Sequence, residues 1–301
     1  MSAPNGSTAV AGELQLVSRQ TQLKEWLLAA LFFACAFLAV LAVALIFIFV
    51  GWRAAPIVSE VGLSEFLLGS VWAPTDGDFG IRALIQGSFV VTFGALIMGT
   101  PLAVGTAVFL SEIASPRIRS VVRPAVELLA GIPSVVYGFF GVVMLRPIIA
   151  EVTGGVGFGP LTASIVLAIM IVPTIAALSE DALGSIPMGI REASFAMGAT
   201  LWQTIYKVVV PAAKIGIVDA IILGMGRAVG ETMAVLMLVG GAPQFFSGVG
   251  QPMSTLTSQI VMDMGYATGT HRTALFGMAA ILFVISMALV LTVRLLSRLR
   301  D

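Results

Sequence analysis

The sequence predicts an all-α membrane protein that crosses the bilayer six times and folds as a single domain. The first observation is composition: 58% of the 301 residues are hydrophobic, only 11% are charged, and the mean hydropathy is +1.04. Soluble domains are typically about 45–50% apolar and about 25% charged. The second observation is a series of nearly charge-free stretches, each long enough for a membrane-spanning helix of about 20 residues. Lipid is therefore the expected solvent for most of this chain.

Charge and composition also argue against several classes of function. The formal net charge is zero, so the chain has no overall basic field for nucleic acid. Its one cysteine, Cys35, and its one histidine, His271, lie far apart in the sequence, which argues against a metal site or a Cys/His catalytic pair. We expect Cys35 to behave as a small buried apolar group, and we expect the chain not to be an enzyme by itself.

Polar residues 1–23 are expected to form a flexible cytoplasmic tail, and residues 24–301 a single transmembrane domain. The tail lacks the basic region and the cleavage site of a signal peptide, so the first apolar stretch should be retained. Six stretches are predicted as transmembrane helices: residues 26–52, 83–111, 121–145, 157–179, 215–240 and 273–293. The longest charge-bearing loop between them covers residues 180–214.

The distribution of lysine and arginine predicts the orientation, because these residues are enriched in cytoplasmic loops. With the N-terminus inside, eleven of the 16 basic residues lie in the inner segments and one, Arg227, lies within a span. The outer segments hold the other four, which are Arg53, Arg82, Arg146 and Arg272. Both termini and the loop 180–214 are therefore predicted to lie in the cytoplasm.

Helix breakers fall inside three of the predicted spans, at Pro101, Pro133 and Pro173. Proline removes one backbone donor and frees a carbonyl, which in lipid must find another partner. Such breaks often line cavities, although a simple packing kink explains any one of them equally well.

The loop 180–214 is typical of a helix, a glycine turn and a second helix. Glu192 and Ala193 lie in the first helix, Gly198 breaks it, and Pro211 ends the second. Apolar residues at helical spacing predict a knob on this hairpin: Phe195, Met197, Leu201, Trp202 and Ile205. On pattern alone, an amphipathic cytoplasmic hairpin without a partner is an equally good interpretation.

These same residues resemble the signature of ABC importer permeases. That signature is Glu-Ala-Ala, three residues, Gly, nine residues and Ile-x-Leu-Pro. This chain has Glu192-Ala193-Ser194, Gly198, Val208, Val210 and Pro211 at the same spacing. The resemblance implies the type I ABC importer permease fold. It also implies that the hairpin is the coupling helix, with Glu192, Ala193, Gly198 and Pro211 serving contact with an ATP-binding subunit.

Two further stretches resemble phosphate-specific transport (Pst) permeases of the C type. They are Val126–Gly138, which reads VELLAGIPSVVYG, and Gly226–Val235, which reads GRAVGETMAV. This resemblance covers nearly the whole chain after Glu25. It implies phosphate import across the bacterial cytoplasmic (inner) membrane. The implied partners are a homologous A-type permease, two ATP-binding subunits and an extracytoplasmic phosphate-binding protein.

The predicted fifth span carries Arg227 and Glu231, and each charge at the bilayer centre costs about 2.5–3.5 kcal/mol on insertion scales. At positions i and i+4 of one helix they share a face and can pair. Gly226 and Gly230 beside them leave room for another helix. Together with Glu127 near the inner end of the third span, we expect this pair to line an anion path, because arginine matches an oxyanion through its fork of donors. The alternative is a structural salt bridge between helices.

The sequence contains no Gly-x-x-x-x-Gly-Lys-Ser/Thr phosphate loop, so we expect ATP to bind partner subunits and this chain to hold no cofactor. The predicted function is that of a permease subunit of an ATP-driven phosphate importer. Two alternatives stay open. One is a permease for another oxyanion, such as sulfate, molybdate or tungstate, and the other, from a different class, is an ion-driven carrier or channel.

Overall fold

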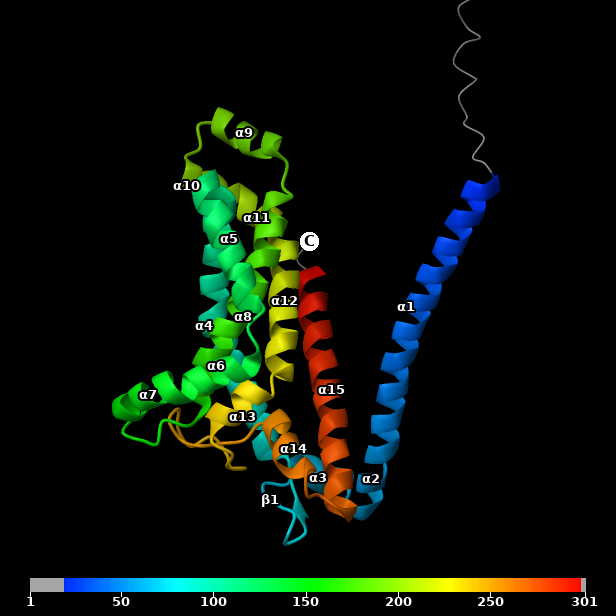
Figure 1. Ribbon diagram of the computed structural model, residues 1–301. Coiled ribbons are helices and arrows are strands. Elements are labelled where there is room, and N and C mark those ends of the chain that lie inside the picture. Colours follow the sequence, from blue (N-terminus) through cyan, green and yellow to red (C-terminus); the bar gives the residue numbers. More distant parts are fainter. Residues whose placement is uncertain (1–18, 299–301) are drawn as a thin grey trace, which may run out of the picture. The chain divides into compact units, whose positions relative to one another are not determined.

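The computed structural model is almost entirely helical and describes residues 19–298, with side chains from residue 24 to residue 295 (Figure 1). The first elements are α1 (Arg19–Ala54), α2 (Pro56–Glu60), α3 (Leu63–Leu68), β1 (Trp72–Ala73), β2 (Asp78–Phe79), α4 (Arg82–Val108), η1 (Phe109–Ile113), α5 (Pro116–Ala130), α6 (Ser134–Phe140) and η2 (Gly141–Leu145). They are followed by α7 (Arg146–Thr153), α8 (Pro160–Gly184), α9 (Met188–Ala196), α10 (Leu201–Thr204), η3 (Ile205–Val209), α11 (Val210–Ala212), α12 (Lys214–Gly230), α13 (Met233–Val239), α14 (Leu256–Met264) and α15 (Gly269–Arg298). The elements η1, η2 and η3 are π-helical turns.

The chain divides into two compact units after Phe49. The described part of the first unit belongs to one helix, α1, which is 36 residues long and runs into the second unit. Between Trp26 and Trp52 α1 is apolar on every side, which is typical of a helix that is surrounded by lipid. Cys35, which the sequence predicts to be buried, is exposed on this helix. The second unit holds the other helices and the two strands, which form an antiparallel hairpin with Trp72 opposite Phe79.

Five helical segments among the described residues are long and apolar enough to cross a membrane. They are Lys24–Glu60, Arg82–Ile113, Ser134–Thr153, Pro160–Gly184 and Gly269–Leu295. A sixth crossing results if Leu201–Ala212 and Lys214–Gly230, which meet at a bend of 68°, are counted as one span. The structure therefore confirms the predicted all-α polytopic fold, with five or six spans according to how this bent pair is counted.

Two predicted span boundaries are wrong. The sequence predicts a third span from residue 121, but α5 occupies this stretch and the apolar helix begins only at Ser134. α5 is a separate amphipathic helix that is capped by Ser115 and buries none of its residues. The predicted fifth span is interrupted after Gly230, where α12 ends and the chain becomes extended at Glu231.

Two of the three predicted helix breaks are also wrong. Pro101 lies inside the continuous helix α4, and Pro173 lies inside the continuous helix α8. Pro173 is buried among neighbouring helices, and such packing lets a membrane helix tolerate the lost backbone hydrogen bond. A break is present at Pro133, whose backbone is extended (φ −58°, ψ 139°) and which precedes the first residue of α6.

The central layer of the second unit consists of α4, α8 and α12, which pack against one another (Figure 1). Small residues allow α4 and α8 to approach closely. A side chain at Gly94 would collide with Ser164, whose hydroxyl donates to the Val91 carbonyl at 3.1 Å. Around this contact lies the largest apolar core, which is built mostly from alanine, valine, leucine and isoleucine.

Smaller apolar clusters close the two ends of this layer. The cluster at the end that carries β1 and β2, here called the strand end, includes Phe66, Trp72, Phe79, Leu256 and Leu275. The cluster at the end that carries α9 and α10, here called the hairpin end, consists of Ala107, Leu183, Val209, Ala213 and Ile217. The central helices are thereby held at both ends as well as along their length.

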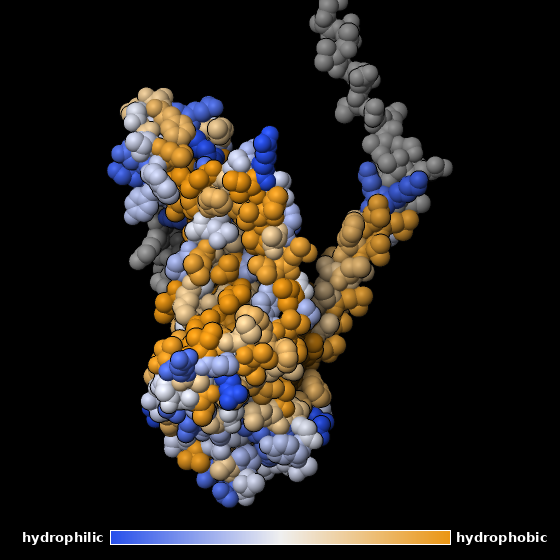
Figure 2. All heavy atoms as spheres, turned by 60° about the vertical axis from the view of Figure 1, so that its left-hand side comes forward, coloured by the Kyte–Doolittle hydropathy of each residue, from blue (hydrophilic) through white to orange (hydrophobic). Residues whose placement is uncertain are grey.

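Apolar side chains cover the middle of the visible face of the second unit, and hydrophilic side chains gather at its two ends (Figure 2). This distribution matches a protein whose middle lies in the hydrocarbon of a bilayer and whose ends lie in the polar interfaces.

The contact between α4 and the segment before α14 depends on Gly87. A Cβ at this position would overlap the Ser254 carbonyl, whereas a Cβ at Gly105, on the same helix, meets no atom within 4 Å. We expect Gly87→Ala to destabilise the protein by about 1–3 kcal/mol, the usual cost of overpacking. Gly105→Ala should be neutral or slightly stabilising. Thermal unfolding of both variants in detergent checks this, and an unchanged Gly87→Ala melting temperature would contradict it.

Candidate functional site

Arg227 lies in the last turn of α12 and is half-buried. Its Nη1 donates to the Thr174 hydroxyl of α8 at 3.1 Å. The guanidinium therefore links α12 to α8. Among the residues that the structure describes, no carboxylate forms an ion pair with it.

The predicted pairing of Arg227 with Glu231 is wrong, because α12 ends between them and they do not occupy successive turns of one helix. The Glu231 carboxylate instead accepts from the backbone amides of Thr232, at 3.2 Å, and Ala234, at 3.4 Å. It thus satisfies free amides at the start of α13. The Glu231 carbonyl accepts from the Thr257 hydroxyl of α14 at 3.1 Å, which fixes the break between α12 and α13.

The surface beside Arg227 is open. Gly230 is exposed, and a Cβ built on it or on the half-buried Gly226 meets no atom within 4 Å, so this side of α12 has room for another side chain or helix. A guanidinium whose one hydrogen-bond partner among the described residues is a neutral hydroxyl retains its positive charge and most of its donors. Such a group is suited to bind an anion, and arginine can do so through two donors at once.

Glu127 lies away from this group. It is on α5, about half exposed (55%), and its carboxylate accepts from Arg123 Nε at 3.1 Å. Arg123 also binds Asp181 at 3.0 Å and lies 3.5 Å from Glu180, both at the end of α8. The three predicted anion-path residues are therefore not brought together: Glu127 belongs to an ion-pair network at the hairpin end, and Arg227 stands apart from Glu231.

The hairpin has the helix–glycine–helix form that the sequence predicts. Glu192 and Ala193 lie exposed on α9, and Gly198 forms the turn with φ +82°, a conformation that favours glycine. Thr200 then begins α10 with a capping box to Gln203. The hairpin continues through η3 into α11, where Pro211 is exposed beside the bend into α12.

Four of the five predicted knob residues are exposed at the tip of this hairpin. Met197 is 88% exposed and Trp202 66%, and Phe195 and Leu201 are also exposed. Ile205 is buried instead, because it turns back toward the base of the hairpin. An exposed apolar tip of this kind marks a surface that another protein can cover.

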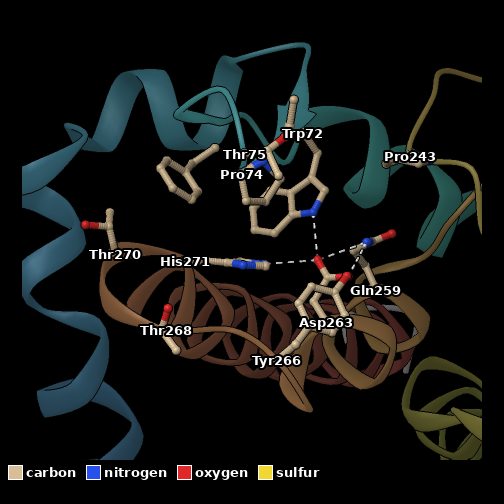
Figure 3. Close-up of a pocket in the computed structure, with 12 residues that line it drawn as sticks. Trp72, Pro74, Thr75, Pro243, Gln259, Asp263, Tyr266, Thr268, Thr270 and His271 are labelled. Atoms are coloured by element: carbon tan, nitrogen blue, oxygen red, sulfur yellow. Dashed lines mark hydrogen bonds and ion pairs between the residues drawn. The ribbon is translucent and has the colours of Figure 1, made fainter.

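A second polar site lies at the strand end and was not predicted from the sequence. Asp263 of α14 is 3% exposed and faces a pocket of about 590 Å³ (Figure 3). Its carboxylate accepts from Trp72 Nε1 at 3.0 Å, Gln259 Nε2 at 3.0 Å and the Tyr266 hydroxyl at 2.7 Å. It also lies 3.2 Å from His271 Nε2. We call these five residues the Asp263 cluster.

The Asp263 cluster joins the strand hairpin to α14 and to the start of α15 (Figure 3). Burial of Asp263 raises the pKa of its carboxyl group, but the hydrogen bonds from Tyr266, Gln259, Trp72 and His271 outweigh burial and hold the pKa below its usual value. All the donors are engaged with the carboxylate, so this cluster is a structural brace. Trp72 and Asp263 are 191 positions apart, which is why no sequence pattern reveals their contact.

Residues 99–300 match the family model described as "Binding-protein-dependent transport system inner membrane component". The chain is 41% identical over 274 residues to the "Probable ABC transporter permease protein YqgH" of Bacillus subtilis, covering 89% of each chain. It is 35% identical over 258 residues to the "Phosphate transport system permease protein PstC" of Pasteurella multocida, covering 79% of this chain and 80% of that protein.

The fold is similar to one chain in the crystal structure of a bacterial alginate ABC transporter in complex with a periplasmic protein bound to an alginate pentasaccharide. The TM-score is 0.65 at 18% identity, with 93% of this chain and 96% of that chain covered. At this level of identity the likeness concerns the fold alone.

The Asp263 cluster gives a prediction for stability. Because the pKa of Asp263 is lowered in the folded state, its stabilisation is present above the unfolded pKa and is lost as the pH falls through the folded pKa. We expect Asp263→Asn to cost about 1.5–3 kcal/mol at neutral pH, the scale of hydrogen bonds to a charged group.

The measurement is thermal unfolding in detergent from pH 7 down to about pH 3, which spans the usual range of a carboxyl pKa. The difference between the original protein and Asp263→Asn should shrink as the pH falls. Asp76→Asn, in the exposed turn of the same strand hairpin, is the matched control. A difference that stays constant with pH would show that the charge of Asp263 contributes nothing.

Proposed function

We propose that this chain, which belongs to the family of binding-protein-dependent transport system inner membrane components and to its PstC-type permeases, forms half of the path through which an ATP-driven importer moves inorganic phosphate. The observation that carries the proposal is the guanidinium of Arg227. It has no carboxylate partner among the described residues and lies at membrane depth beside an uncovered helix face. The phosphate named for the PstC relatives supplies the chemistry of the substrate.

The chain is a multi-pass membrane protein of an inner-membrane transport family and works with an ATPase and a substrate-binding partner. We propose in addition that the partners are a homologous A-type permease, two ATP-binding subunits and an extracytoplasmic phosphate-binding protein. ATP binds the partner subunits in this proposal, and the chain itself holds no cofactor. The basic residues of the inner segments support an orientation with both termini and the hairpin in the cytoplasm.

The contacts of Arg227 support phosphate binding at this residue. Thr174 accepts one hydrogen bond from Nη1, so its own hydroxyl proton can be donated to an anion that sits on the same guanidinium. Glu231 is engaged by the amides of α13, so it does not compete for the guanidinium. The open face at Gly226 and Gly230 is where we place the A-type permease, which would close the other side of the path.

The hairpin supplies the coupling in this proposal. The apolar tip at Met197 and Trp202 inserts into a groove of an ATP-binding subunit, and Gly198 permits the tight turn that presents it. An ion-driven carrier or a channel has no use for such a tip, and so the hairpin favours an ATP-driven importer. Competition between phosphate and sulfate in uptake decides which oxyanion is carried.

Arg227→Gln should abolish phosphate uptake while the complex still assembles, because the anion loses the cationic group in the last turn of this helix. Arg227→Lys should recover only part of the uptake, since an ammonium lacks the planar fork of donors. Arg117→Gln, an exposed arginine of α5, is the matched control and should transport normally. Uptake of labelled phosphate in vesicles, with recovery of the complex, measures both effects. Loss of assembly in Arg227→Gln would instead indicate a structural role.

Gly198→Leu should leave the chain in the membrane but remove its contact with the ATP-binding subunit. A leucine at φ +82° is strained by about 1–2 kcal/mol and projects from the turn toward the partner. Gly189→Ala, on α9 of the same hairpin and with open space around it, is the control. Co-purification of the ATPase and phosphate uptake are the measurements. Normal uptake by Gly198→Leu would refute the docking role of the hairpin.

A further inference from the structure

The first arm of the hairpin, α9, is attached to the rest of the protein in an unusual way. None of its residues is fully buried, and its apolar residues Met188, Ile190 and Phe195 are all exposed, so apolar packing contributes little to its attachment. A cavity of about 530 Å³ lies beside it, lined by α9 and by η1, the turn that follows α4. Ser194 bonds Thr204 at 2.9 Å within the hairpin. Among the described residues, Arg191 is the only side chain of α9 that forms a hydrogen bond outside the hairpin.

Arg191 makes four hydrogen bonds across this gap. Its Nε donates to Glu112 Oε2 at 3.0 Å and its Nη2 to Glu112 Oε1 at 2.7 Å, which is a bidentate ion pair. Its remaining contacts are to the carbonyls of Leu183, at 3.0 Å, and of Ile186, at and just beyond the end of α8. One guanidinium therefore joins α9 to two long helices.

The Arg191–Glu112 pair is sheltered from water and geometrically fixed. The side chain of Arg191 is 12% exposed and that of Glu112 6% exposed. Ser111 also donates to Glu112 at 2.8 Å, which holds the carboxylate in place. The hydrogen bonds of a bidentate pair have fixed directions, so the pair resists sliding and rotation of one helix on the other. A purely apolar contact has no such directions and permits both movements. Loss of one partner would leave the other charge poorly solvated.

We propose that Arg191 and Glu112 form the mechanical joint through which movement of the hairpin reaches the transmembrane helices. This inference rests on the proposed coupling role of the hairpin and adds the residues that pass the movement on. Glu112 ends the span that begins at Arg82, so a pull on this carboxylate acts along α4. Because α4 packs along α8, a shift of α4 changes the position of Thr174 and hence of the anion site. Arg191 and Glu112 are thus positioning residues.

The test uses the assembled complex in proteoliposomes, with the permease partner, the ATPase subunits and the phosphate-loaded binding protein. Three quantities are measured: phosphate uptake, ATP hydrolysis, and cross-linking of a cysteine introduced by Met197→Cys to the ATPase subunit in a Cys35→Ser background. The variants are Arg191→Gln, Arg191→Lys and the exchange of the pair, Glu112→Arg with Arg191→Glu. Arg117→Gln is the control, as an exposed arginine at the same end of the protein.

For Arg191→Gln we expect the cross-link and ATP hydrolysis to persist while phosphate moved per ATP falls by about tenfold, the scale of substitutions that interrupt coupling between sites. Arg191→Lys should be intermediate, and the exchanged pair should recover part of the loss. A parallel loss of cross-link, hydrolysis and uptake in Arg191→Gln would overturn the proposal, since Arg191 would then only maintain the hairpin. Unchanged uptake per ATP would overturn it as well. If the Met197→Cys protein that retains Arg191 gives no cross-link, the hairpin does not dock on the ATPase subunit. The proposed joint between Arg191 and Glu112 would then be refuted as well.

Discussion

The close packing of α4 on α8 is the contact on which the other features of the second unit depend. It requires small residues such as Gly94, and the hydroxyl of Ser164 stays satisfied inside it by the Val91 carbonyl. The packing fixes the position of the polar groups along the length of each helix. α8 offers Thr174 to Arg227 near its middle and Glu180 to the arginines of α5 near its end, and α4 leads to Glu112. Displacement of either helix would separate several of these pairs at once.

Polar side chains divide into three levels along this scaffold. At the strand end the Asp263 cluster ties distant segments together with a charge that is fully hydrogen-bonded. At the hairpin end, arginines of α5 and α9 bind carboxylates of α8 and η1. Between these levels Arg227 has a hydroxyl partner and, within the described part of the chain, no carboxylate partner. The ion pairs named above lie at the two ends, and we propose that the charge between them binds the transported anion.

The sequence predicted the fold class well because composition and span length respond to the bilayer, which acts on every residue of a helix. It predicted the hairpin because one glycine, Gly198, needs a left-handed turn that few other residues adopt. It failed at Glu231 because periodicity assumes an unbroken helix, and the break there depends on amides of α13 and on Thr257. It placed the third span too early because the apolar residues just before Pro133 belong to an amphipathic helix.

Local sequence patterns could not predict the contacts between residues that are far apart in the chain. The bond from Trp72 to Asp263 and the pair of Arg191 with Glu112, 79 positions apart, follow from how the helices are stacked. Arg191 directly precedes Glu192, the first residue of the permease signature. The sequence therefore identified the segment that contains Arg191, but it did not identify Glu112 as the partner of Arg191.

The exposed tip of the hairpin has a consequence for the lifetime of the protein in a cell. Met197 and Trp202 present an apolar surface to water for as long as nothing covers them. Surfaces of this kind drive aggregation and attract the quality-control machinery that removes unassembled chains. A permease made in excess of its ATPase would keep this apolar tip exposed and would be degraded. In an assembled permease the ATPase would cover the tip. The side chains that we propose to dock on the ATPase would then also keep the subunits of the importer in balanced amounts.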